Sequence, residues 1–219
     1  MHWSAEDGWS LLGGTQTKER ISEEKEKRVD GMIYNSICDI AGKYEIVYTD
    51  PPWAQTKGNV RKCRPNQGKS LDYQTLSMED IKALHMEFLS KCTMDKHNVF
   101  MWTIDKFLHD TEKMMKELGY DLHARFVWDK ENGIAPAFTV RFSHEYLLWF
   151  YRKGNILMPR EEMRGKYTTV LREQSTKHSK KPICAYEMIE NLFSGAKRIE
   201  LFARNIRDGW DSFGNEIGG

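Results

Sequence analysis

Short apolar segments that alternate with amphipathic segments constrain the fold of this chain more than any other feature. Strand-like runs occur at residues 44–49, 99–103, 124–128, 146–151 and 198–203, and helix-like segments occur at residues 77–89, 105–118 and 182–193. Strands separated by helices of about a dozen residues are typical of a layered α/β domain with a mainly parallel sheet. A chain of 219 residues can bury a substantial core, so one such domain is the default expectation.

The first 30 residues differ from the rest of the chain. They contain two tryptophans, a Gly-Gly turn and then a charged run over residues 18–28. This composition predicts a polar leader over residues 1–30 that ends in a solvated helix, followed by the α/β domain over residues 31–219. The residues of the leader indicate no function.

Charge and cysteine content narrow the classes of protein. Lys and Arg total 33 against 32 for Asp and Glu, so any nucleic-acid surface must be local. The four cysteines, Cys38, Cys63, Cys92 and Cys184, are scattered and follow no signal-like segment, which predicts reduced thiols in a cytoplasmic protein. No run approaches the roughly 18 apolar residues of a membrane span, so no membrane is expected.

The apolar run at residues 44–49 stops at Asp50-Pro51-Pro52-Trp53. Proline cannot continue a central strand, so a buried strand here ends in a rigid turn. This tetrapeptide suits the methylation of adenine's exocyclic amine, a poor nucleophile because its lone pair is delocalised into the ring. Asp50 and the Pro51 carbonyl could each accept one N–H, Pro52 would stiffen the turn, and Trp53 could stack on an extruded base. The alternative interpretation is an acidic strand end, a tight turn and a packed tryptophan.

Further segments around this tetrapeptide carry a resemblance to a known family. They are Cys38-Asp39-Ile40, the tetrapeptide itself, residues 71–77, 100–103 and 128–130, Glu145 with its apolar run, residues 178–182 and 200–204, Gly209-Trp210 and residues 214–216. In this order they resemble the adenine N(6)-methyltransferase family with the Asp-Pro-Pro-Trp motif. That family includes the catalytic subunit of the eukaryotic messenger-RNA adenosine methyltransferase and bacterial and phage DNA adenine methyltransferases.

The resemblance implies a Rossmann-like, S-adenosylmethionine-dependent methyltransferase fold with a permuted motif order, since Asp50 precedes residues 200–204. It also implies the residues that hold the cofactor. Asp39 and the backbone around Ile40 would meet the adenine, and Asn215 and Glu216 the ribose. Lys181 would meet the carboxylate, and Asp50, Arg204 and Asn205 would line the pocket.

Each of these assignments has a structural alternative. Asp39 could cap a turn, Lys181 could belong to a solvated helix start, and Asn215-Glu216 could be an ordinary polar tail. Glu200 could be a half-buried strand carboxylate paired with Lys197 or Arg198, and it is left outside the predicted site.

The acceptor side is predicted from a local excess of cations. The segment over residues 54–72 lacks apolar periodicity and reads as a long loop whose basic residues suit phosphate contacts. Its cations include Lys57, Arg61, Lys62 and Arg64. The resemblance adds Tyr73, Lys130 and Glu145 on the side of the target base. A polar stretch over residues 160–181 could close over the site or be a solvated loop.

No metal is predicted, because His178 has no Cys or His neighbours at metal-ligand spacing. The sequence thus predicts direct in-line methyl transfer from S-adenosylmethionine to the 6-amino group of adenine in nucleic acid, with DNA favoured over RNA on resemblance. The alternatives are RNA adenosine, a different amine such as cytosine or a protein amide, and a non-catalytic nucleic-acid-binding partner subunit. A homodimer or a partner subunit is compatible with all of them.

Overall fold

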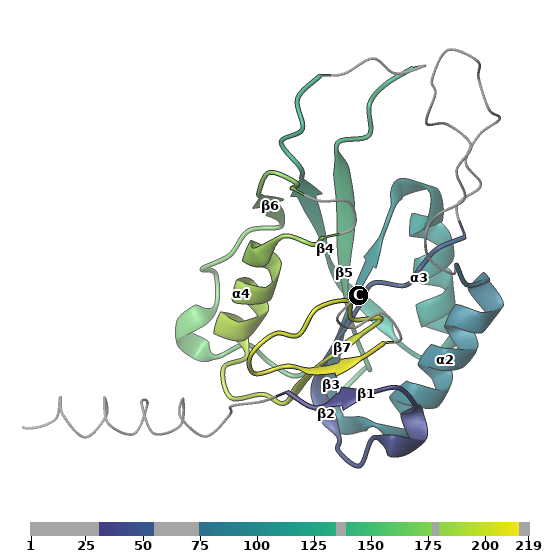
Figure 1. Ribbon diagram of the computed structural model, residues 1–219. Helices are drawn as coiled ribbons and strands as arrows, with labels where there is room; N and C mark the ends of the chain where they lie inside the picture. Colours follow the sequence, from purple (N-terminus) through teal and green to yellow (C-terminus); the bar gives the residue numbers. More distant parts are fainter. Residues whose placement is uncertain (1–30, 55–74, 135–138, 177–179, 215–219) are drawn as a thin grey trace, which may run out of the picture.

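The computed structural model describes residues 31–54, 75–134, 139–176 and 180–214 (Figure 1). Within these residues the strands are β1 (Ile33–Tyr34), β2 (Tyr44–Thr49), β3 (Thr93–Thr103), β4 (Asp121–Asp129), β5 (His144–Tyr151), β6 (Val170–Arg172), β7 (Arg198–Leu201) and β8 (Asp211–Phe213). The α-helices are α2 (Met78–Lys91), α3 (Leu108–Glu117) and α4 (Ile183–Leu192), and the 3-10 turns are η1 (Ile37–Asp39), η2 (Asp105–Phe107) and η3 (Glu161–Met163). The predicted leader over residues 1–30 lies outside the described residues.

The described strands form one eight-stranded sheet in the order β1-β8-β7-β2-β3-β5-β4-β6. Strand β2 lies inside the sheet and pairs in parallel with β3 on one side and β7 on the other. Strand β5 runs antiparallel to both of its neighbours, β3 and β4, whereas the other described pairings are parallel. The predicted α/β class with a mainly parallel sheet is therefore confirmed.

Helices cover both faces of the sheet, with α2 and α3 on one side and α4 on the other (Figure 1). The side chains of a strand alternate between the two faces, so each strand supplies both layers of core. In β3, Val99 and Met101 join the apolar cluster under α2 and α3. Phe100 and Trp102 join the cluster under α4. The near-continuous apolar character of this strand follows from its burial on both faces.

The predicted ends of the helices agree with the capping residues in the structure. Ser77 is the N-cap of α2, where its hydroxyl accepts a 3.1 Å hydrogen bond from the backbone N–H of Asp80. Gly119, which the sequence places at the end of the next helix, has a φ of +86°, the left-handed conformation that suits glycine after a helix. The helix predicted at residues 105–118 divides into η2 and α3.

Strand boundaries were less accurate. Strand β3 begins six residues before the predicted Val99, at Thr93, because its first part is polar and carries no apolar signal. The last predicted strand, residues 198–203, ends at Leu201 as β7. Strands β1, β6 and β8 were not predicted, since segments of two or three residues show no periodicity.

Two further sequence expectations concern the oxidation state of the cysteines and the presence of a membrane span. The described cysteines, Cys38, Cys92 and Cys184, are free thiols, and Cys63 lies outside the described residues. None of the described helices is long and apolar enough to cross a membrane.

Candidate active site

The turn after β2 is held rigidly by the backbone. The N–H of Trp53 donates to the carbonyl oxygen of Pro51 at 2.9 Å, which closes a tight three-residue turn. The N–H of Leu76 donates to the Pro52 carbonyl at 3.0 Å, and Trp53 and Leu76 form a parallel β-bridge. A carbonyl oxygen has two lone pairs, so the Pro51 oxygen retains acceptor capacity beyond its bond to Trp53.

Trp53 packs into the protein beneath this turn. Its side chain is 5% exposed, and its indole N–H donates to the Trp102 carbonyl at 3.3 Å. Its ring stacks on Phe107 with a centroid separation of 5.4 Å and an interplanar angle of 20°. These contacts agree with the structural alternative of a packed tryptophan and anchor the turn. Stacking of Trp53 on a target base stays a prediction.

A row of alternating charges runs from Asp50 along one edge of the sheet, where the parallel strands end and the antiparallel β5 begins. Lys181 Nζ lies 3.0 Å from Asp50 Oδ1 and 2.7 Å from Glu145 Oε2. Lys130 Nζ contacts the other Glu145 oxygen at 2.5 Å. Lys181 also lies 5.0 Å from the centre of the Trp102 ring. The structure therefore unites Asp50, Lys130, Glu145 and Lys181, which lie far apart in the sequence.

In this row of ion pairs, neighbouring cations offset the burial of the Asp50 carboxylate less completely than that of the Glu145 carboxylate. Burial raises the pKa of Asp50, and Lys181 opposes that rise without cancelling it. Burial would also raise the pKa of Glu145, but Lys181 and Lys130 outweigh it, so its pKa lies below the ordinary value. For Lys181, two carboxylates outweigh burial and raise the pKa of the ammonium. The difference between the carboxylates follows from their partners, because Glu145 has two close cations and the shorter contact with Lys181.

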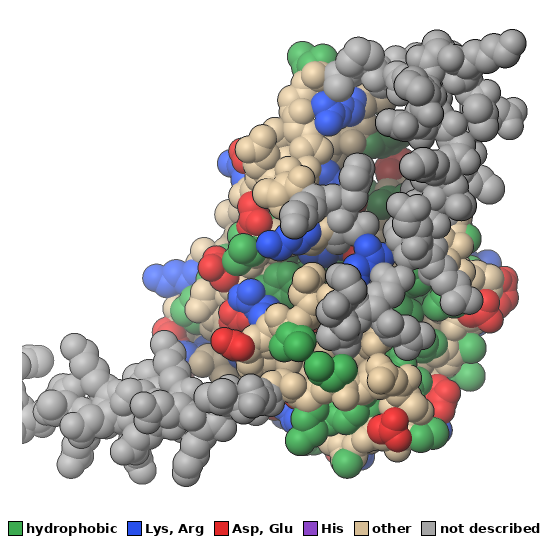
Figure 2. Space-filling view, viewed as in Figure 1, with side chains coloured by type: hydrophobic (Ala, Val, Ile, Leu, Met, Phe, Trp, Pro, Cys, Tyr) green, Lys and Arg blue, Asp and Glu red, His purple; other side chains and the backbone are tan. Residues whose placement is uncertain are grey.

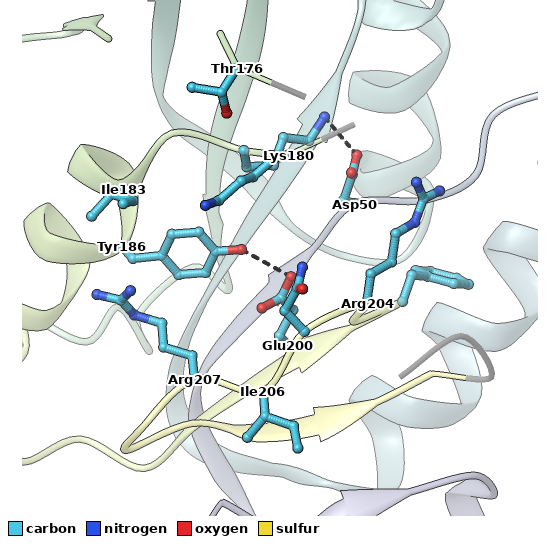
Figure 3. A pocket seen from close by; sticks show the side chains of 12 residues that line it. Asp50, Thr176, Lys180, Ile183, Tyr186, Glu200, Arg204, Ile206 and Arg207 are labelled. Atoms are coloured by element: carbon cyan, nitrogen blue, oxygen red, sulfur yellow. Dashed lines mark hydrogen bonds and ion pairs between the residues drawn. The ribbon is translucent and has the colours of Figure 1, made fainter. Parts of the chain in front are cut away.

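Two cavities of about 480 Å³ and 380 Å³ adjoin Asp50. Asp50, Phe202 and Arg204 line both of them, so the structure brings Asp50 and Arg204 together just beyond the carboxyl ends of β2 and β7. Figure 3 shows Asp50 and Arg204 facing the first cavity from the turn after β2 and from the segment after β7. Figure 2 shows the molecule from the same side as Figure 1, and Lys and Arg side chains gather near the middle of this face.

The predicted cofactor residues fall into three groups. Lys181 and Asn205 line the first cavity, and their contact with a cofactor stays a prediction. Asp39 is exposed in η1, and Ile40 is buried directly after it; neither lines either of these two cavities, whereas nearby Asn35 lines the second. Residues 215–216 lie outside the described residues.

The predicted acceptor residues are described only in part. Lys130 and Glu145 belong to the row of ion pairs, while the remaining residues of this group lie outside the described residues. These are Lys57, Arg61, Lys62, Arg64 and Tyr73, and His178 lies outside them as well.

Glu200 is a cavity residue that sequence reasoning left out. It lies in β7, lines the first cavity with Tyr186, and accepts a 3.0 Å hydrogen bond from the Tyr186 hydroxyl (Figure 3). Burial is the main cause that raises the pKa of Glu200 to about 7, and the charge of Asp50 adds to the rise. The available signal was a carboxylate inside a short apolar strand, since such groups are rarely buried without a reason.

The alternative partners suggested for Glu200 are engaged elsewhere. Lys197 Nζ lies 4.0 Å from Asp211, and Arg198 donates a hydrogen bond to the Phe193 carbonyl. The carboxylate of Glu200 instead faces the cavity that Asp50 lines.

Phe202, which follows β7, has an unusual backbone. Its φ is +60°, a left-handed conformation that is strained for an aromatic residue. The next residue holds this shape, because the Ala203 N–H donates to the Phe213 carbonyl at 3.0 Å. Gly214 packs so closely that a Cβ there would lie 2.5 Å from the Ala203 oxygen. Strain at a residue that lines both cavities is typical of a ligand site.

The described residues contain no group of three or more His, Cys, Asp or Glu side chains that could hold a metal ion. The chemistry assembled at the strand ends is a carboxylate beside backbone carbonyls, an ammonium and two ligand-sized cavities. An α/β sheet that ends in an Asp-Pro-Pro-Trp turn beside such cavities has the architecture of an amino-group methyltransferase.

Comparison with known proteins identifies the family. The chain belongs to the MT-A70 family, whose model matches residues 44–216. It is 29% identical over 191 residues to the type II methyltransferase M.MunI of Mycoplasma sp, covering 80% of this chain and 78% of that protein. The predicted family and enzyme class, a methyltransferase, are confirmed.

Eukaryotic relatives match over a similar part of this chain. The N(6)-adenosine-methyltransferase catalytic subunit METTL3 of Homo sapiens is 28% identical over 189 residues, covering 82% of this chain and 29% of that protein. The METTL3 subunit of Danio rerio is 29% identical, with the same two coverages. The chain thus spans less than a third of these eukaryotic proteins but most of the bacterial one.

Proposed function

We propose that this chain transfers a methyl group from S-adenosylmethionine to the 6-amino group of adenine in nucleic acid, with Asp50 as the residue that holds the amine. The observation that carries the proposal is the rigid Asp50-Pro51-Pro52-Trp53 turn at the border of two adjoining cavities. Membership of the MT-A70 family and the names of the METTL3 relatives support the same chemistry.

Asp50 and Pro51 supply two acceptors on a fixed backbone. The Asp50 carboxylate can accept one N–H of the amine, and the free lone pair of the Pro51 carbonyl can accept the other. Two such bonds draw the amine nitrogen out of conjugation with the ring, which makes its lone pair available. Because the turn is rigid, little reorganisation is needed when charge develops on the nitrogen.

The described residues fit S-adenosylmethionine in size and charge. A cavity of about 380 Å³ or 480 Å³ falls within the range of small-molecule sites. Asp50 and Glu200 offer carboxylates to a cationic ligand, Lys181 and Arg204 offer donors to a carboxylate or a ribose, and Phe202 offers an apolar ring. When bound, S-adenosylmethionine supplies an activated methyl group on a sulfonium. The assignments of Asp39, Ile40, Asn205, Asn215 and Glu216 remain proposals from the resemblance.

Glu145 and Lys130 belong to the acceptor side in this proposal. Glu145 is 15% exposed at its side chain and is fixed by two lysines, so its position is defined before a substrate arrives. Tyr73 and the cations Lys57, Arg61, Lys62 and Arg64 complete this side as predicted from the sequence. Trp53 would support the base through its turn or stack on it.

DNA is the favoured substrate, because the chain matches a compact type II methyltransferase over most of its length. The test incubates the protein with DNA and RNA oligonucleotides and isotopically labelled cofactor, and measures methylated bases by mass spectrometry. We expect label in N(6)-methyladenine from DNA. Label confined to RNA would reverse the substrate preference, and label on cytosine or on protein would replace adenine as the acceptor.

A non-catalytic subunit with the same fold is the second candidate function. It would keep the sheet and the nucleic-acid surface but not a working cofactor pocket. Titration calorimetry with S-adenosylmethionine distinguishes the two, since the enzyme should release heat on binding and the subunit should not. The presence of both cavities beside Asp50 favours the enzyme.

The four cations predicted to contact phosphates lead to a prediction on salt dependence. Replacing Lys57, Arg61, Lys62 and Arg64 by Ala should weaken DNA binding similarly for all sequences, because phosphate contacts carry little sequence information. The slope of log affinity against log salt should fall by about 1 for each cation that contacts a phosphate. Fluorescence anisotropy at several salt concentrations measures this slope. An unchanged slope would remove these cations from the interface.

A further inference from the structure

A buried histidine lies directly behind the catalytic turn. His85 of α2 and Thr49 of β2 are both fully buried, and Thr49 Oγ1 lies 3.0 Å from His85 Nε2. The other ring nitrogen, Nδ1, lies 2.7 Å from the carbonyl oxygen of Ile81. Thr49 is the residue immediately before Asp50, so this pair joins helix α2 to the start of the turn.

The direction of both hydrogen bonds follows from their partners. A backbone carbonyl can only accept, so Nδ1 of His85 carries the proton and donates to Ile81. In the neutral ring the second nitrogen, Nε2, is then an acceptor, and the hydroxyl of Thr49 must donate to it. Burial lowers the pKa of His85 to about 4, which keeps the ring neutral at physiological pH.

The same ring reaches the cofactor side of the site. The centroids of the His85 and Phe202 rings are 6.0 Å apart at an angle of 40°. Phe202 lines both cavities and has the strained left-handed backbone described above. One buried side chain therefore touches the residue before Asp50 and the aromatic ring that borders the ligand space.

We propose that His85 is a positioning residue for methyl transfer, which acts through the Thr49 hydroxyl to fix the backbone that carries Asp50. The proposal rests on the proposed function. A hydrogen bond from Thr49 to His85 restricts the rotamer of Thr49 and ties the last residue of β2 to α2. The Asp50 carboxylate and the Pro51 carbonyl, which must meet one amine together, then start from a fixed strand end.

A matched pair elsewhere in the molecule separates positioning from simple stability. His97 of β3 has the same arrangement, with Nδ1 2.6 Å from the Met94 carbonyl and Nε2 2.6 Å from the Tyr120 hydroxyl. It lies toward the amino-terminal part of β3, whereas the active site lies at the carboxyl ends of the strands. Tyr120→Phe thus removes a buried hydroxyl-to-histidine hydrogen bond without touching the proposed machinery.

The first experiment compares Thr49→Val with Thr49→Ser and Tyr120→Phe by steady-state methylation kinetics and thermal unfolding. Thr49→Val keeps the shape and removes the donor, and we expect kcat to fall about tenfold. Thr49→Ser keeps the hydroxyl and should restore most of that loss. Tyr120→Phe should lower Tm but leave kcat and KM within about twofold of the wild type. Equal kcat for Thr49→Val and Tyr120→Phe, or no rescue by Ser, would overturn the proposal.

Two substitutions of His85 test the same Thr49–His85 hydrogen bond at its histidine end. The amide N–H of asparagine can replace Nδ1–H as the donor to the Ile81 carbonyl, whereas the amide oxygen of glutamine can replace Nε2 as the acceptor from the Thr49 hydroxyl. His85→Asn should therefore lose kcat as Thr49→Val does, and His85→Gln should retain more activity. The double variant Thr49→Val/His85→Asn should be no slower than either single variant, because both remove the same interaction. Additive losses would contradict the link.

Failure of the proposed function can be distinguished from failure of this inference. If the wild type methylates no nucleic acid, the proposed function fails. If the wild type is active and the Thr49→Val and Thr49→Ser variants have the same kcat as the wild type, only the positioning role of His85 fails. Titration with S-adenosylmethionine on every variant separates a loss of cofactor binding from a loss of turnover.

Discussion

An Asp50→Ala variant is expected to lose more than about 1000-fold in kcat while remaining folded, since it removes an acceptor for the amine and an electrostatic group at the reacting centre. The measurement is the rate of label transfer to an adenine-containing oligonucleotide under saturating cofactor. The fold should survive, because Lys181 keeps its 2.7 Å contact with Glu145 when Asp50 is lost. Burial also raises the pKa of Asp50, so the ionised carboxylate is disfavoured in the folded protein and its removal should lower Tm only slightly.

The control for this variant is Asp105→Ala. Asp105 lies just beyond the carboxyl end of neighbouring β3, but it is exposed and lines neither cavity. Its removal should leave kcat within about threefold of the wild type, as expected for a surface substitution away from the site. Full activity in Asp50→Ala would exclude Asp50 from the mechanism.

A Lys181→Met variant is expected to move the acid limb of the activity profile to higher pH. Burial already raises the pKa of Asp50, and Lys181 is the first of the groups that oppose this rise. Without the ammonium, the pKa of Asp50 rises further, so the carboxylate is protonated and inactive at pH values where the wild type works. We expect kcat/KM to fall at pH values on the acid limb and to recover as pH increases.

The same variant should also destabilise the protein. Lys181 is only 11% exposed at its side chain, and its loss leaves Asp50 and Glu145 without the cation between them. Breaking a buried ion pair by removing one partner costs about 3 kcal/mol or more, which denaturant unfolding would measure. Lys181→Arg keeps the charge and should retain the wild-type acid limb. If Met and Arg variants gave the same pH profile, the charge of Lys181 would have no part in tuning Asp50.

Much of the fold was predictable because local chemistry specifies it. Pro51-Pro52 cannot continue a central strand, and Ser77 caps a helix with its own side chain. Periodicity identified the longer strands and helices, since both faces of this sheet are covered and its strands are apolar. The antiparallel direction of β5 was not predicted, because strand direction depends on pairing partners that lie far apart in the chain.

The site divides in the same way. Asp50-Pro51-Pro52-Trp53 stands out as a contiguous motif, and the resemblance located Lys130, Glu145, Lys181 and Arg204. The hydrogen bond between Glu200 and Tyr186 was not predictable, because it joins β7 to α4. Likewise, a lone histidine such as His85 in a helical segment indicates nothing until its neighbours are known.

The sequence by itself determined the class of fold, the Asp50-Pro51-Pro52-Trp53 turn and the order of the motifs, because each depends on residues that are adjacent or periodically spaced. Only the tertiary structure decided how charge is shared between Asp50 and Glu145, and which buried groups lie behind Asp50. The physical reason is that Coulomb interactions, burial and hydrogen bonds depend on distance in space. Lys181 is 131 positions from Asp50 in the chain (181 minus 50), yet its ammonium lies 3.0 Å from that carboxylate.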